Sequence, residues 1–116
     1  MTDRLPPGLW VAATIRRAAS EGVPIVVRHR GDPDSGSLLI KINLLNGTAR
    51  VLEQVARDDG SPAWNPLGAT DPLPDAEAEA CLERYGSFDS DAWILEIEDR
   101  RGRLWFTEGD NVSHAP

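Results

Sequence analysis

Five acidic side chains are the most enzyme-like group in this 116-residue sequence. Glu96 and Glu98 alternate with apolar residues in a strand-like segment, so they are expected on one face, about 7 Å apart. Asp99 follows that segment directly, and Asp32 and Asp34 lie in an earlier polar loop. Such carboxylates could hold Mg²⁺ or Mn²⁺, or act as a general acid and base if burial drove their pKa values apart. The reading that we favour is structural, because an acidic strand face is commonly the solvated face of an antiparallel sheet.

The loop at residues 28–36 is the second candidate site, and its candidate binding residues are Arg28, His29, Arg30, Asp32 and Asp34. Its Asp, Pro, Ser and Gly residues are turn formers, so local backbone needs explain the loop without a ligand, and we favour that reading. An anion or a nucleotide could instead be bound by the two arginines and the loop amides, although the spacing matches no known phosphate loop. His29 is close enough in sequence to the two aspartates for a histidine–carboxylate pair.

The composition is that of a globular protein of one-domain size, with 41% hydrophobic and 27% charged residues. The formal net charge of −7 argues against general nucleic-acid binding, which depends on neutralising phosphates. No apolar run approaches the length of a membrane span, and the N-terminus lacks the apolar core of a secretory signal. The single cysteine, Cys81, excludes an internal disulfide. We therefore expect a cytoplasmic protein that does not contact membranes.

The first part of the chain predicts one helix followed by a strand. Pro6 and Pro7 are tolerated in a first helical turn, and apolar residues recur at helical spacing up to about residue 20. The small alanines on that face predict a helix that lies close against a sheet. Residues 23–29 are rich in β-forming residue types and predict the first strand.

Two further strands are predicted at residues 37–45 and 48–55. Asn46-Gly47 between them predicts a two-residue type I′ hairpin turn, because both central residues of that turn need a positive φ. The turn would set Leu45 opposite Thr48. The face expected to form the core then carries Ile40, Ile42, Leu44, Ala49, Val51 and Val55.

Residues 57–74 predict a long loop with four prolines. Loops of this length in compact domains are usually functional or mobile. Trp64 either pins the loop to the body of the protein, which we favour, or forms the aromatic wall of a binding cleft. Trp64 is therefore a candidate binding residue.

The last part of the chain predicts a second helix and a closing hairpin. Asp75 is expected to cap a helix at residues 76–85. Residues 91–98 and 103–107 are expected to pair as a hairpin, with apolar side chains on one face of the first strand. Residues 109–116 are expected to form a flexible C-terminal tail.

Several short motifs together resemble a known family. They are Gly8-Leu9-Trp10 at the start of a helix that carries Arg16-Arg17, Arg30-Gly31-Asp32 in a loop that ends at Gly36, and the segment at residues 91–100. The chain is similar in these motifs, over nearly its whole length, to the bacterial domain-of-unknown-function family 1491. The resemblance implies a small stand-alone bacterial cytosolic protein, and it transfers no catalytic role because the family carries no assigned activity.

We predict an α+β fold in residues 1–108, with an antiparallel sheet of about five strands, two helices packed on one face and the order α-β-β-β-α-β-β. The function we favour is a non-enzymatic binding or adaptor module whose partner is another protein, with homodimerisation through a sheet edge as a further expectation. The alternatives are a small metal-assisted hydrolase that uses the Asp/Glu cluster and an anion or nucleotide binder at residues 28–36. No cofactor is expected under the favoured reading, and Mg²⁺ or Mn²⁺ belongs to the hydrolase alternative.

Overall fold

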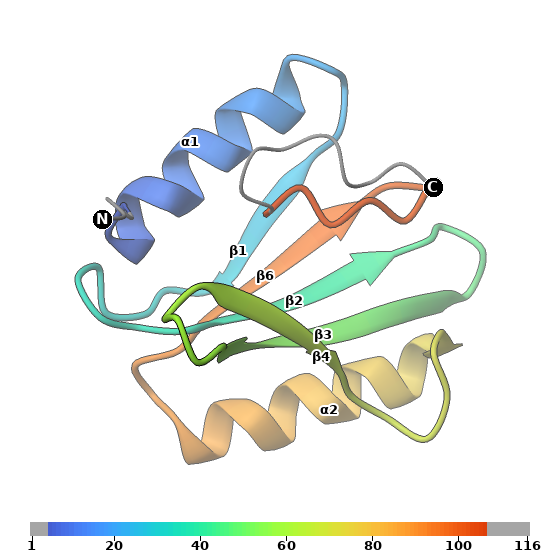
Figure 1. Cartoon of the computed structure of the whole chain (residues 1–116). Helices are drawn as coiled ribbons and strands as arrows, with labels where there is room; N and C mark the ends of the chain where they lie inside the picture. Colours follow the sequence, from blue (N-terminus) through green and yellow to red (C-terminus); the bar gives the residue numbers. More distant parts are fainter. Residues whose placement is uncertain (1–4, 107–116) are drawn as a thin grey trace.

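A six-stranded sheet lies between two helices in the computed structural model, which describes residues 5–106 (Figure 1). The elements in chain order are α1 Pro7–Ala19, β1 Ile25–His29, β2 Leu38–Asn43, β3 Thr48–Ala56, β4 Pro62–Pro66, β5 Leu73–Pro74, α2 Asp75–Phe88 and β6 Trp93–Glu98. The fold class is therefore α+β with a mostly antiparallel sheet, as predicted, and the order of elements roughly matches the expectation. The tail expected at residues 109–116 lies outside the described residues.

The last strand, β6, is inserted into the middle of the sheet. The strand order is β1-β6-β2-β3-β4, and β5 pairs with the start of β3. Among the described strands, β6 and β2 run parallel, with Leu39 beside Ile94, while the other pairs are antiparallel. β6 has a neighbour on each edge, and its residues Trp93, Leu95 and Ile97 are buried in the core under α1.

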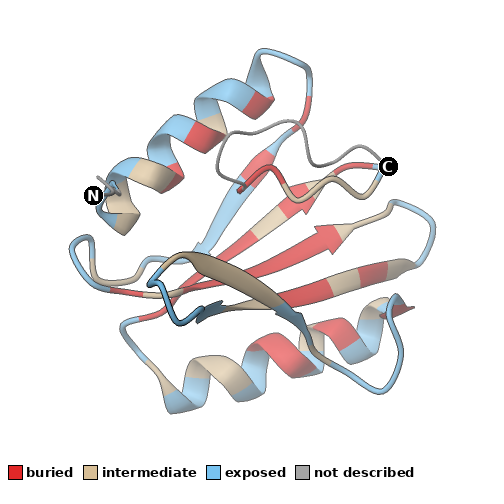
Figure 2. Ribbon diagram, in the orientation of Figure 1, coloured by how far each residue is buried: buried red, intermediate tan, exposed pale blue. Residues whose placement is uncertain are grey.

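The helices cover opposite faces of the sheet, which corrects the expectation of two helices on one face (Figures 1 and 2). Ile40 and Leu95 belong to the core under α1, whereas Leu39 packs with Ala78 and Leu82 of α2 on the other side. Figure 2 shows buried residues along the central strands and on the helix sides that face them. Two covered faces explain why five consecutive residues of β2 are buried.

The β2–β3 hairpin has a longer turn than the predicted two-residue type I′ turn. The Leu44 N–H donates to the Thr48 carbonyl oxygen at 3.1 Å, so residues 45–47 form a three-residue loop. The pairing register is therefore shifted by one residue from the predicted one. A shift of one residue exchanges the faces of a strand, and Ala49 and Val51 accordingly face α2 and not α1.

Two other predicted boundaries also change. Residues 57–74 are not one long loop, because β4 pairs antiparallel with β3 from Pro62 to Pro66, and β5 follows. The second strand predicted for the closing hairpin, at residues 103–107, is absent from its described part, because residues 103–106 form no strand. Trp105 has a φ of +68° there, which a strand residue does not adopt.

The helix ends carry residues suited to their positions. Pro7 is the first residue of α1, and Arg16 and Arg17 lie in its last turn, where cations interact favourably with the helix dipole. Asp75, expected as a cap, is instead the first residue of α2, and Asp75 and Glu77 place negative charge in the first turn. Neither helix in the described part of the chain is both long enough and apolar enough to cross a membrane.

Candidate functional site

The polar loop at residues 30–37 wraps around the start of β6. The Asp32 N–H donates to the Asp91 carbonyl oxygen at 2.9 Å, and the Trp93 indole N–H donates to the Asp32 carbonyl oxygen at 2.9 Å. The backbone N–H of Trp93 donates to the Ser37 carbonyl oxygen at 2.8 Å. The loop at residues 30–37 and the segment at residues 91–93 therefore form one structural unit with Trp93 at its centre.

The amides of this loop are used for internal hydrogen bonds. The Asp32 carboxylate accepts hydrogen bonds from the N–H groups of Asp34 at 2.8 Å and Ser35 at 3.0 Å. These two hydrogen bonds hold the pKa of Asp32 below its ordinary value, and the bond from Asp34 has the larger effect. The Gly36 N–H donates to the Asp32 carbonyl oxygen at 3.1 Å. An anion cradled by these amides would have to displace the contacts that shape the loop.

His29 and Arg30 contact the same structural unit. Nδ1 of His29 lies 2.9 Å from the Ala92 carbonyl oxygen, and because a carbonyl only accepts, that nitrogen carries the proton. The guanidinium carbon of Arg30 lies 5.4 Å from the centre of the Trp93 ring, a cation–π distance. His29 is therefore paired with the main chain and not with either loop aspartate.

A buried lysine organises the charges between the sheet and α2. The Lys41 side chain is 3% exposed, and its ammonium group lies 2.7 Å from Asp75, contacts Glu79 and lies 3.5 Å from Glu96. Arg28 on β1 binds Glu79 at 2.7 Å and Glu96 at 2.6 Å. The acidic side chain of Glu96 thus has a structural role, because it joins two cations on a half-buried face.

The ion network fixes the charge states of its members. Burial alone would lower the pKa of Lys41, but its hydrogen bonds to Asp75 and Glu79 outweigh burial and raise it. The hydrogen bond from Arg28 is the main cause that lowers the pKa of Glu79 to about 2. Arg28 and Glu79 also line a hollow of about 300 Å³. Their charges neutralise each other there, so the hollow offers no unpaired cation of its own to an anionic ligand.

The lowered pKa of Glu79 predicts a loss of stability in acid. A carboxylate whose folded-state pKa is about 2, against 4.5 ordinarily, stabilises the fold above the ordinary value and loses that contribution as pH falls through the folded value. We expect the free energy of unfolding, measured with urea, to fall between about pH 5 and about pH 2. The fall should be shallower in Glu79→Gln. Glu83→Gln, which removes an exposed acid of the same helix, should keep the wild-type slope, and equal slopes in the two variants would contradict the assignment.

Asp99 is buried at the corner that follows β6. Its carboxylate accepts hydrogen bonds from Nε of Arg103 at 2.8 Å, from the Trp105 indole at 3.0 Å and from the Arg101 N–H at 2.9 Å. Burial alone would raise the pKa of Asp99, but these bonds, with that from Arg103 the strongest, lower it. Arg17 of α1 donates to the Trp105 carbonyl oxygen. Asp99 therefore holds residues 101–105 against the end of β6, and Arg17 connects this segment to α1.

The five acids of the candidate cluster occupy separate places. Asp32 and Asp34 lie in the loop, Glu96 lies in the ion network under α2, and Asp99 lies at the buried corner. Glu98 is half-buried, two residues beyond Glu96 on β6. Within residues 5–106, no three His, Cys, Asp or Glu side chains are grouped so that they could hold a metal ion. The Mg²⁺ or Mn²⁺ alternative therefore finds no ligand group in that part of the chain.

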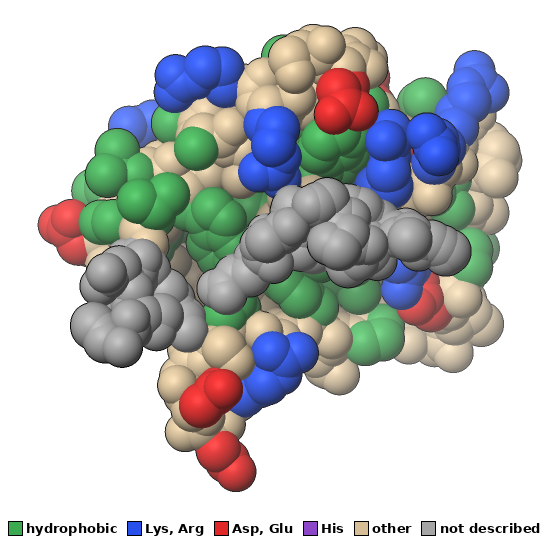
Figure 3. All heavy atoms as spheres, turned by 45° about the horizontal axis from the view of Figure 1, so that its top comes forward, with side chains coloured by type: hydrophobic (Ala, Val, Ile, Leu, Met, Phe, Trp, Pro, Cys, Tyr) green, Lys and Arg blue, Asp and Glu red, His purple; other side chains and the backbone are tan. Residues whose placement is uncertain are grey.

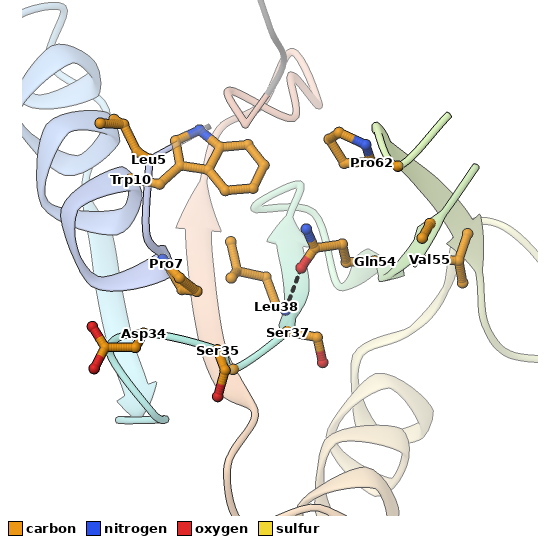
Figure 4. Close-up of a pocket in the computed structure, with 13 residues that line it drawn as sticks. Leu5, Pro7, Trp10, Asp34, Ser35, Ser37, Leu38, Gln54, Val55 and Pro62 are labelled. Carbon is orange, nitrogen blue, oxygen red and sulfur yellow. Dashed lines mark hydrogen bonds between the residues drawn. The ribbon is translucent and has the colours of Figure 1, made fainter. Parts of the chain in front are cut away.

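An apolar groove opens between α1 and the β3–β4 hairpin (Figure 4). Its volume is about 340 Å³, which lies at the lower end of the range for ligand pockets. Its base is formed by residues 34–38. One wall carries Leu5, Pro7 and Trp10, and the facing wall carries Gln54, Val55 and Pro62.

One wall of the groove includes an open main-chain edge. The β2–β3 ladder ends at the pair Leu39 and Glu53, although β3 continues to Ala56. The Leu38 N–H donates to the side-chain oxygen of Gln54 at 2.8 Å (Figure 4). The alternation of an antiparallel ladder directs the main-chain groups of Gln54 and Ala56 toward the groove. No described strand pairs with them on that side.

Two aromatic rings hold Trp10 in place. The Trp10 ring centre lies 6.3 Å from that of Trp64 and 5.5 Å from that of Phe106, with a tilted and an edge-on contact respectively. Trp64, a candidate from the sequence, therefore supports the groove through Trp10. Leu5 and Leu9 near the start of α1 are 51% and 58% exposed. Figure 3 shows exposed hydrophobic side chains on the left of the view, the side on which α1 begins.

Lys41 and Gln54 were missed as functional candidates by sequence reasoning. Lys41 did carry a signal, because a lysine inside the apolar run at residues 38–42 predicts a buried charge that needs partners. The groove carried no comparable local signal. Its walls come from separate segments, and each residue is unremarkable in its own segment.

These features define a small α+β protein whose sheet is covered on both faces and carries an apolar groove at one end. The family model described as "Protein of unknown function (DUF1491)" matches residues 5–107. The chain belongs to this family, which confirms the resemblance in its motifs. The family description assigns no function.

Solved structures of similar proteins share the fold. A crystal structure of a DUF1491 family protein from Caulobacter crescentus CB15 is 37% identical, with 90% of this chain and 97% of that chain covered and a TM-score of 0.77. An NMR structure of a DUF1491 family protein from Caulobacter crescentus CB15 is 36% identical, with 92% and 96% covered and a TM-score of 0.79. The solution structure of protein Atu0922 from A. tumefaciens is 26% identical, with 83% and 86% covered and a TM-score of 0.69. The comparison with curated proteins gives no match.

Proposed function

We propose that this protein is a non-enzymatic binding module that takes an extended segment of a partner protein into the apolar groove. The observation that supports the proposal is the combination of an apolar wall at Trp10 with an open main-chain edge at Gln54 and Ala56. An apolar side chain of the segment would fill the cavity while its main chain bonds to the edge. Proteins that recognise an added strand combine these same two kinds of contact.

The dimensions of the groove suit a short segment. The open edge spans residues 54–56, which corresponds to about 10 Å of extended chain. A cavity of about 340 Å³ has room for only a few apolar side chains. The recognised element is therefore a few residues of extended chain and not a whole domain surface.

The charge of the chain favours a basic segment. The formal net charge is −7, and Asp34 contributes to the base of the groove. Opposite charge speeds the encounter of two proteins, and salt screens this attraction. A segment with a basic residue beside its apolar residue fits both the local and the overall charge.

Panning a random peptide display library against the wild-type protein tests the proposal. We expect the enriched peptides to share an apolar residue in an extended segment. A synthetic peptide of enriched sequence should bind Val55→Glu about tenfold more weakly or worse, because Val55 lines the groove beside the open edge and the substitution adds a charge there. Isothermal titration calorimetry measures the two affinities.

Val27→Glu is the matched control for this experiment. Val27 and Val55 are both strand residues with 38% exposure, but Val27 lies on β1, away from the groove. The Val27→Glu variant should bind the peptide with wild-type affinity. Equal affinity of Val55→Glu and the wild-type protein, or a panning experiment that enriches no peptide, would contradict the proposal.

A further inference from the structure

The strand order ends at β1 on one side and at β4 on the other, with the two-residue β5 also beside β3, and β1 and β4 differ in their protection against pairing. β4 has Pro62 and Pro66 at its ends, and proline offers no N–H to an added strand. The segment from Ile25 to Val27 of β1 contains no proline, and its apolar side chains Val26 and Val27 are 47% and 38% exposed. Within the described residues, β1 is therefore less protected against pairing with another strand than β4 is.

The ladder with β6 determines which main-chain groups of β1 point outward. The Glu98 N–H donates to the Pro24 carbonyl oxygen at 3.0 Å, and the antiparallel register continues through Val26. Alternate residues of a strand bond to the same neighbour, so Pro24 and Val26 face β6. Ile25 and Val27 then direct their N–H and C=O groups to the free edge. The missing N–H of Pro24 does not interrupt that edge.

The regular part of β1 is self-complementary. The register with β6 shifts after Val27, and such a bulge ends the straight outer edge. A two-fold axis at Val26 uses only the straight part, because it sets Ile25 opposite Val27 of the second copy. Val26 then lies opposite Val26, and Arg28 lies opposite Pro24 of the second copy. No like charges are opposed directly in this register.

We propose that the protein forms a homodimer in which two β1 strands pair antiparallel about Val26 and join two sheets into one. The pairs of Ile25 and Val27 exchange main-chain hydrogen bonds, and the two Val26 side chains meet beside the axis. The interface is small, so the dimer is weak and reversible. β3 and β4 lie at the other end of the strand order, so their groove walls stay open and the inference is independent of the proposed binding function.

Disulfide trapping tests this register. A non-hydrogen-bonded antiparallel pair has Cα atoms about 4.5 Å apart, a separation that a disulfide accepts. Val26→Cys should therefore form a covalent dimer under mild oxidation about tenfold or more faster than Val55→Cys, because pairing raises the effective concentration of the two thiols. The native Cys81 is buried and present in both variants.

Sedimentation equilibrium provides the second readout. The wild-type protein should show a monomer–dimer equilibrium at concentrations up to about 1 mM. Val26→Lys should stay monomeric with an unchanged circular dichroism spectrum, and Val55→Lys should dimerise like the wild-type protein. A wild-type protein that is monomeric over this range, or equal cross-linking rates for the two cysteine variants, overturns the proposal.

Discussion

Lys41→Met is expected to lower the free energy of unfolding by about 3 kcal/mol, because it removes one partner from a buried ion network. The Lys41 side chain is 3% exposed and contacts Asp75, Glu79 and Glu96. Methionine keeps most of the volume of the side-chain stem, so the change removes a charge and leaves little cavity. Arg28 still pairs Glu79 and Glu96, and water screens the partly exposed Asp75. The expected loss of unfolding free energy is therefore at the low end of the range for breaking a buried ion pair. Urea unfolding at neutral pH measures it.

Arg50→Met is the control for a pair that is open to water. Arg50 donates two hydrogen bonds of 2.8 Å to Asp71, but the two side chains are 35% and 30% exposed. Pairs of this kind contribute about 1 kcal/mol or less. An equal loss in Lys41→Met and Arg50→Met would argue against a buried network.

The central strands were predictable from the sequence, but the placement of the helices was not. The apolar face predicted for residues 91–98 is formed by Trp93, Leu95 and Ile97, which are buried, and β6 lies in the middle of the sheet. The apolar residues Leu39 and Ile94 fall on the face that was taken for solvent. Nearly continuous apolar runs are typical of strands buried on both faces, so these residues carried the signal of a second helical layer. The parallel pairing of β2 with β6 joins distant segments, and no local pattern encodes it.

The β2–β3 hairpin shows how tertiary packing overrides a local turn rule. Asn46-Gly47 predicted the reversal at the right place in the chain. Leu45, however, adopts a φ of +62°, which an apolar residue rarely does. The longer loop brings Ala49 and Val51 into the core under α2. Burial of these side chains offsets the strain at Leu45, and a reading of turn propensity alone could not weigh the two effects.

The two candidate sites were predictable to different degrees. Turn-forming residues indicated the loop at residues 30–37, although they did not indicate that the loop encloses the Asp91 carbonyl group. The groove depends on the meeting of Trp10 with Gln54. These residues come from a helix and a strand that the sequence alone does not place side by side. The groove also depends on where the β2–β3 ladder ends, and no local pattern in the sequence encodes that end.

Gly36→Ala is expected to destabilise the protein by about 3 kcal/mol, because the new Cβ has no space. An ideal Cβ at Gly36 would lie 2.2 Å from the Asp91 carbonyl oxygen, and one at Gly31 would lie 2.3 Å from the same atom. That oxygen accepts the hydrogen bond from the Asp32 N–H, so it cannot move without losing the bond. The loop would have to shift away from β6, and the indole of Trp93 would lose its contact with Asp32.

Gly86→Ala is the control that separates this steric effect from a general effect of replacing glycine. Gly86 lies within α2, and a Cβ there would meet only Cδ1 of Ile94 at 3.5 Å, an ordinary contact. Alanine is the better helix former, so this variant should gain about 0.5–1 kcal/mol. Both substitutions restrict the unfolded chain in the same way. A lower urea midpoint for Gly36→Ala together with a higher one for Gly86→Ala would therefore assign the loss of stability to the contact with Asp91. A wild-type midpoint for Gly36→Ala would refute that contact.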